Sequence, residues 1–193
     1  MIPRYNGAQA QKMTSGAALP AGGYVAAIQS ARVENYSWGN MLVIAYDVSE
    51  GEHSNHFRKQ FDENTDPNRK WKGTFRLTVP NEKSKYFSSE KRTFNNFIFV
   101  LEQSNPGFHF DWEESHLKGK FFGALVRNKE FLNDKGEKIS TTECGGCTDI
   151  QSIRDGSFTP LKDKLLKEDA ASVNAQTTGA ADIFDDDDDL PFN

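Results

Sequence analysis

The order of hydrophobic and polar residues along the chain predicts a mainly β domain. A partly β-branched segment at residues 24–33 and a near-continuous apolar run at 41–48 are typical of strands, and the polar turn between them predicts a hairpin. Residues 56–61 alternate, with Phe57, Lys59 and Phe61 on one face, which predicts a third strand. The polar segment 62–91 that follows leaves room for one further short strand at 74–79.

A helical period replaces the strand pattern at residues 91–104. Phe94, Phe97, Ile98 and Leu101 stand at i, i+3, i+4 and i+7, which predicts one apolar stripe that faces the core. Either Ser88 or Ser89 is expected to cap this helix, and the sequence Asn-Pro-Gly at 105–107 is expected to end it.

Two more strands are expected after the helix. They cover residues 118–131 and 139–153, separated by a turn at 133–136, and Gly123 predicts a bulge or bend in the first of them. A short helix is expected at residues 162–171.

This order of strands and helix matches the five-stranded OB-fold, a Greek-key barrel, here with one α-helix between strands 3 and 4. Another small α+β sheet domain with the same order is the alternative. We expect a flexible N-terminal arm at 1–21, the OB-fold domain at 22–168, a flexible linker at 169–181 and a terminal tip at 182–193. Both termini are expected to be disordered.

Composition and charge narrow the classes of function. The chain has 193 residues and a formal net charge of -5, yet all 23 Lys and Arg lie at or before Lys167. A body with the cations and a tail with only acids is typical of a polyanion binder. No run of 18 apolar residues is present, so no membrane association is expected. The first 16 residues lack an apolar signal core, which predicts a cytoplasmic protein.

Single-stranded nucleic acid is bound by cations that follow the phosphates and by aromatic rings that stack on bases. The stretch Arg69-Lys70-Trp71-Lys72, in a polar loop, fits this need best, although Trp71 in such a loop can also fold back to cover the end of a barrel. The first hairpin tip adds two more aromatic rings. The candidate nucleic-acid contacts are Tyr36, Trp38, Phe57, Arg58, Lys59, Phe61, Arg69, Lys70, Trp71, Lys72, Phe75, Arg76, Arg127 and Lys129.

Metal binding and catalysis receive less support. Cys144 and Cys147 have the spacing of a metal-ligand pair, and His53 and His56 complete a Cys2His2 zinc site arithmetically. The other interpretation of the cysteine pair is a Gly-Gly bulge in the last strand. No catalytic motif appears, so we expect a non-enzyme without a cofactor. A metal-dependent nuclease that uses Asp111, Glu113 and Glu114 is the enzymatic alternative.

The last twelve residues carry the most specific pattern of the sequence. Five consecutive aspartates lie between two short apolar segments, one ending in Phe184 and the other formed by Leu190-Pro191-Phe192. Adjacent like charges and a proline prevent folding in isolation, whereas an apolar plug beside acids suits a basic partner with an apolar pocket. The candidate partner-binding residues are Phe184, Asp185, Asp186, Asp187, Asp188, Asp189, Leu190, Pro191 and Phe192.

This ending closely resembles the C-terminal tip of bacterial and bacteriophage single-stranded DNA-binding proteins, although Asn193 follows the Phe on which that family usually ends. The resemblance implies a protein that coats single-stranded DNA in replication, recombination and repair. It also implies that the tip recruits a helicase, primase, polymerase or nuclease, in the host cytoplasm if a phage encodes the protein. A homo-oligomer is compatible with this function. The alternative is an OB-fold adaptor that binds proteins and has no DNA affinity.

Overall fold

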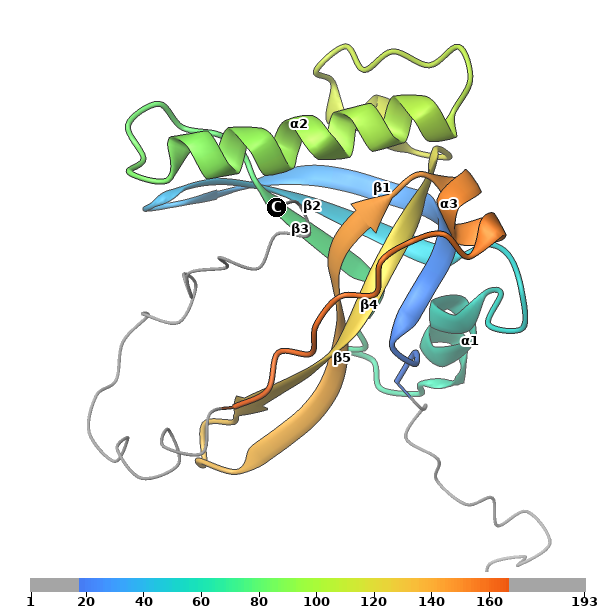
Figure 1. Ribbon diagram of the computed structural model, residues 1–193. Coiled ribbons are helices and arrows are strands. Elements are labelled where there is room, and N and C mark those ends of the chain that lie inside the picture. The colour runs from blue at the N-terminus through green and yellow to red at the C-terminus, as the bar shows by residue number, and fades with distance from the viewer. Residues whose placement is uncertain (1–17, 167–193) are drawn as a thin grey trace, which may run out of the picture.

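The computed structural model describes residues 18–166, which form one five-stranded antiparallel sheet with helices around it (Figure 1). The sheet has the order β3-β2-β1-β4-β5. Its strands are β1 (Gly22–Tyr36), β2 (Gly39–Val48), β3 (Thr74–Thr78), β4 (Phe121–Leu132) and β5 (Lys138–Thr148). The helices are α1 (His56–Glu63), α2 (Phe87–Ser104), the 3-10 turn η2 (Glu114–Leu117) and α3 (Ile150–Asp155).

The sheet curls until its two edge strands meet. β3 and β5 are in contact, and β5 curves towards β3 in Figure 1. Within residues 18–166 no hydrogen-bonded ladder joins them, so the sheet is open along this line. We call the line between β3 and β5 the seam. The prediction of a mainly β domain with one principal helix is confirmed at this level.

The core lies between the concave side of the sheet and α2. Phe97 and Leu101 of α2 are fully buried, and Phe97 meets the ring of Phe122 edge-on at 6.1 Å. The predicted apolar stripe is therefore confirmed. The predicted serine cap is wrong, because α2 begins at Phe87 after Tyr86, and no side chain caps it.

Residues 56–61 form the helix α1 and not the predicted strand. Phe57 and Phe61 are four residues apart, so they also share one helix face. The carboxylate of Asp47 in β2 accepts hydrogen bonds from the backbone N–H groups of Phe57 at 3.0 Å and Arg58 at 3.1 Å. This buried carboxylate satisfies two donors that a helix start leaves unpaired. The strand prediction failed because the cap comes from another element.

The hairpin β4–β5 departs from the prediction in two places. The bulge lies in β5 at Gly145, opposite Leu125 and Val126, and not at Gly123. Gly123 instead leaves room for α3, since a Cβ there would lie 2.7 Å from Ile153. Residues 150–155 are accordingly helical and do not continue the last strand.

The described chain ends in an extended segment beside β4, where a short helix was predicted. Lys164 forms a parallel bridge with Lys129, and the Asp163 carboxylate accepts a hydrogen bond from the backbone N–H of Asn128 at 3.0 Å. We call residues 161–166 the strap. It pairs with the part of β4 that β1 does not reach, because the β1–β4 ladder stops at Val126.

At the other end, Leu19 is 2 % exposed and belongs to the core. None of the helices in the described part of the chain is long and apolar enough to cross a membrane.

Candidate nucleic-acid interface

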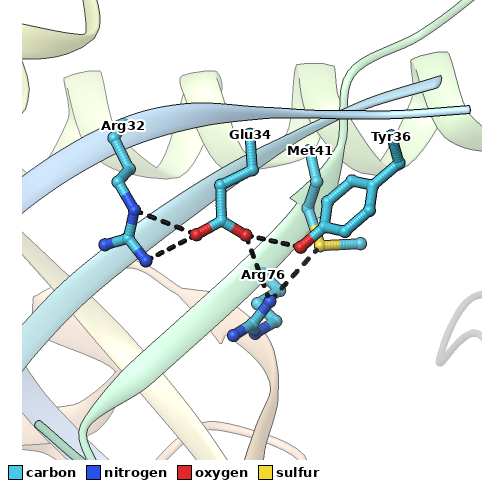
Figure 2. Close-up of polar contacts among 5 residues, drawn as sticks. All are labelled: Arg32, Glu34, Tyr36, Met41 and Arg76. Carbon is cyan, nitrogen blue, oxygen red and sulfur yellow. Dashed lines mark hydrogen bonds and ion pairs between the residues drawn. The ribbon is translucent and has the colours of Figure 1, made fainter. Parts of the chain in front are cut away.

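The convex side of β1, β2 and β3 carries a cluster of charged and aromatic side chains. In the register of these strands Arg32 pairs with Val43, which in turn pairs with Arg76, so the two arginines lie on one side of the sheet. Two residues further along β1, Glu34 pairs with Met41 of β2 and lies on the same side of the sheet as Arg32. Figure 2 shows that these side chains gather on the same surface as Tyr36. We call Arg32, Glu34, Tyr36, Met41 and Arg76 the outer face.

Glu34 holds the polar groups of the outer face together. Its Oε1 accepts hydrogen bonds from Arg32 Nε at 2.9 Å and Nη2 at 2.5 Å, and its Oε2 accepts one from the Tyr36 hydroxyl at 2.5 Å. Arg76 Nη1 lies 3.6 Å from Oε2 (Figure 2). The hydrogen bonds from Tyr36 and Arg32 hold the pKa of Glu34 below its usual value, so the carboxylate is charged at neutral pH. The arginine side chains are 59 % and 50 % exposed, and thus remain accessible to an anion.

Two aromatic rings extend the outer face to the tip of the β1–β2 hairpin. The rings of Tyr36 and Trp38 stack with centroids 5.0 Å apart and planes 12° from parallel. Ser37 and Trp38 form the tight turn, which fixes the indole beside Tyr36. A stacked pair whose first ring is 40 % exposed and hydrogen-bonded to Glu34 is a rigid platform for a base.

Trp71, the favoured sequence candidate, is held against the body of the domain. Its indole N–H donates to the backbone oxygens of Tyr46 at 3.0 Å and Gly73 at 3.1 Å. Phe61 packs on the ring, and the guanidinium of Arg58 lies 5.9 Å from its centroid. This geometry agrees with the alternative interpretation, in which Trp71 folds back onto the domain. Substitution of Trp71 therefore affects folding as well as any surface contact.

The remaining candidates near this loop divide by exposure. Phe57 and Phe75 are 8 % and 4 % exposed and pack in the core, so neither ring offers an exposed face for stacking on the outer surface. We therefore leave both out of the site. The exposed cations on α1 and the following loop are Arg58, Lys59, Arg69, Lys70 and Lys72. Arg69 lies over the Phe61 ring at 4.6 Å.

The two cations of β4 are paired on the sheet. Arg127 Nη2 lies 3.1 Å and Lys129 Nζ 2.7 Å from the carboxylate of Glu143 in β5. Although burial raises the pKa of Glu143, the hydrogen bond and charge of Lys129 and the charge of Arg127 bring it below its usual value. These three residues form a charged ladder of the β4–β5 hairpin.

No zinc site is assembled among residues 18–166, where no group of three or more His, Cys, Asp or Glu side chains is placed to hold a metal. Cys144 and Cys147 flank the bulge at Gly145, in agreement with the alternative interpretation of this motif. Burial raises the pKa of both thiols, that of Cys147 to about 12. Both thiols are therefore protonated at neutral pH.

The acidic residues of the nuclease alternative are not gathered into a metal site either. Asp111 Oδ2 lies 2.8 Å from His116 Nδ1, and this hydrogen bond lowers the pKa of Asp111. Both side chains are more than half exposed. The pair stabilises the loop before β4.

Sequence reasoning missed Arg32 and Glu34. The predicted first strand stopped at residue 33, so the outward positions at its end were not compared with those of β3. The alternation Arg32, Glu34, Tyr36 was the available signal, since residues two apart share a strand face. The tip residues, Phe184 to Phe192, lie outside the described residues. The sequence matches no protein-family model and no curated protein.

Proposed function

We propose that this protein is a single-stranded DNA-binding protein of the OB-fold class. The observation that carries the proposal is the outer face, where two exposed arginines lie beside a rigid pair of stacked rings. Cations follow a phosphate backbone and aromatic faces stack on bases irrespective of sequence. The same two groups are what a strand-coating protein needs.

The strand order supports the finer assignment to the OB-fold. The sequence of strands, the position of α2 between β3 and β4 and the approach of β3 to β5 fit a partly open five-stranded barrel. OB-folds bind oligonucleotides on the side of their second and third strands and with the loop between strands 1 and 2. Arg76, Tyr36 and Trp38 occupy these positions here.

The proposed mechanism is non-catalytic. Arg32 and Arg76 neutralise phosphates, Trp38 and Tyr36 offer a stacking surface, and the tip recruits replication or recombination proteins. Support for the recruiting role comes from the sequence of residues 182–193. The competing proposal is an adaptor that uses the same tip and has no affinity for DNA. The two proposals differ in one measurable property, salt-dependent binding of a single strand.

The test is the affinity for an oligothymidine strand, measured by fluorescence anisotropy over a range of salt concentrations. In the double variant Arg32→Ala/Arg76→Ala the slope of log K against log salt becomes shallower by about 1.4, since each phosphate contact on a single strand contributes about 0.7. In Trp38→Ala binding weakens by about 1–3 kcal/mol without a change in slope.

The matched control is Lys83→Ala/Arg92→Ala, which removes two exposed cations outside the outer face and is expected to keep the wild-type slope. Thermal unfolding of each variant establishes that it folds. If the wild-type protein shows no salt-dependent binding, the proposal fails and the adaptor stands. If it binds but the Arg32/Arg76 variant keeps its slope, the strand lies elsewhere on the protein.

A further inference from the structure

A partly open pocket of about 290 Å³ lies at the seam between β3 and β5. Tyr46 and Phe57 contribute aromatic edges to its lining, and Val126 and Cys144 contribute apolar surface. Thr74 of β3 and Thr141 of β5 also belong to the lining. The volume is close to the lower end of the range for small-ligand sites, which suits a group of the size of one nucleotide.

The pocket adjoins the outer face along β3. Thr74 lines the pocket, and Arg76 stands two residues further along, so both lie on one side of the strand. Two residues of a strand span roughly 7 Å, about the distance between successive phosphates of an extended single strand. A backbone that contacts Arg76 therefore passes the mouth of the pocket at its next nucleotide.

The chemistry of the lining fits a nucleobase. Aromatic edges and apolar side chains accept the faces of a planar ring. The hydroxyls of Thr74 and Thr141 have no hydrogen-bond partner among the described residues, and a hydroxyl both donates and accepts. Lys72 is exposed at the rim, where its ammonium group can meet the phosphate of the same nucleotide.

We propose that the seam pocket takes one unstacked base of a single strand whose backbone lies on the outer face. The inference rests on the proposed function and adds a contact that stacking on the hairpin tip does not provide. It assigns Thr74 and Thr141 to the base and Lys72 to its phosphate. A strand bound in this way has one nucleotide whose base contributes more to affinity than the bases on either side of it.

The experiment is an abasic scan. An oligothymidine of about eight nucleotides, within the site size of one OB-fold, is made with a single abasic position moved along the strand. For the wild-type protein, removal of the base at one position is expected to weaken binding about tenfold. Removal of a base that stacks on an aromatic ring is expected to weaken binding less. The variant Thr141→Trp fills the pocket and is expected to weaken binding of the intact strand by a similar factor. In this variant, removal of the base at the sensitive position of the strand is expected to have no further effect on affinity.

The matched control is Ser140→Trp. Ser140 is exposed, lies next to Thr141 in β5 and is not part of the pocket lining, so this variant is expected to keep the wild-type profile. If the wild-type protein binds with the expected salt dependence but the scan finds no sensitive position, the pocket does not hold a base. The proposed function then still stands. A wild-type profile in folded Thr141→Trp also overturns the pocket and leaves the proposed function standing. If Thr141→Trp does not fold, the wild-type scan decides. Absence of any salt-dependent strand binding refutes the inference together with the proposed function.

Discussion

At the scale of single residues, Asp47 sets the conformation of a segment ten positions later in the chain. Its side chain is buried at 4 % exposure and accepts hydrogen bonds from three backbone N–H groups, those of Val48, Phe57 and Arg58. Asn55, the residue before α1, has a left-handed backbone and gives no side-chain cap. The helix therefore depends on a carboxylate supplied by the sheet, which in turn places Phe57 in the core.

The variant Asp47→Ala leaves the start of α1 without these acceptors. We expect a loss of about 2 kcal/mol in the free energy of unfolding, from the lost cap and the unsatisfied buried N–H groups. Urea titration followed by circular dichroism measures it. The control is Asp62→Ala, an exposed acid of the same helix, with an expected change of less than about 0.5 kcal/mol. Equal stabilities of the two variants would show that the cap is not required.

At the scale of elements, local patterns were sufficient where an element is specified by its own residues. The stripe of α2 and the apolar run of β2 are of this kind, and both predictions are confirmed. The alternation at residues 56–61 fits a strand and also an i, i+4 helix face, and only the distant Asp47 decides between them. The strap was not predictable for the same reason, because its partners lie in β4, about 35 residues earlier.

The candidate site was predicted in part for a related reason. Tyr36, Trp38 and Arg76 were chosen from their residue types and positions and do lie near one another. Arg32 and Glu34 join them only through the register of β1 with β2 and of β2 with β3, which the sequence does not specify. The burial of Phe75 follows from that register as well.

The strap is expected to open as a unit separate from the rest of the sheet. In Asp163→Ala the side-chain bonds to the N–H and Nδ2 of Asn128 are lost, and the Lys164 backbone loses its anchor beside Glu130. We expect the amides of Asn128 and Glu130 to exchange with solvent about fivefold faster, with little change in global stability. Hydrogen exchange measured by NMR tests this, with Asp134→Ala in the β4–β5 turn as the control. Unchanged exchange at both amides would contradict the assigned role of Asp163.

At the scale of the whole molecule, the arrangement of charge predicts competition between the tail and DNA. Residues 1–168 hold all 23 Lys and Arg but only 21 of the 28 acidic residues, and the five aspartates at 185–189 follow on the same chain. An acidic segment tethered near exposed arginines occupies them at low salt, and a polyanion must displace it. Both attractions weaken as salt screens them.

Removal of residues 172–193 is therefore expected to raise the affinity for a single strand about tenfold at low salt, and to have a vanishing effect at high salt. Replacing Asp185 to Asp189 with asparagine reproduces the effect, because charge causes it. Replacing Phe184, Leu190 and Phe192 with alanine is expected to leave strand affinity unchanged, because these side chains carry no charge. Anisotropy titrations at several salt concentrations compare the three variants. Affinity that stays the same after truncation at low salt would show that the tail does not compete with DNA.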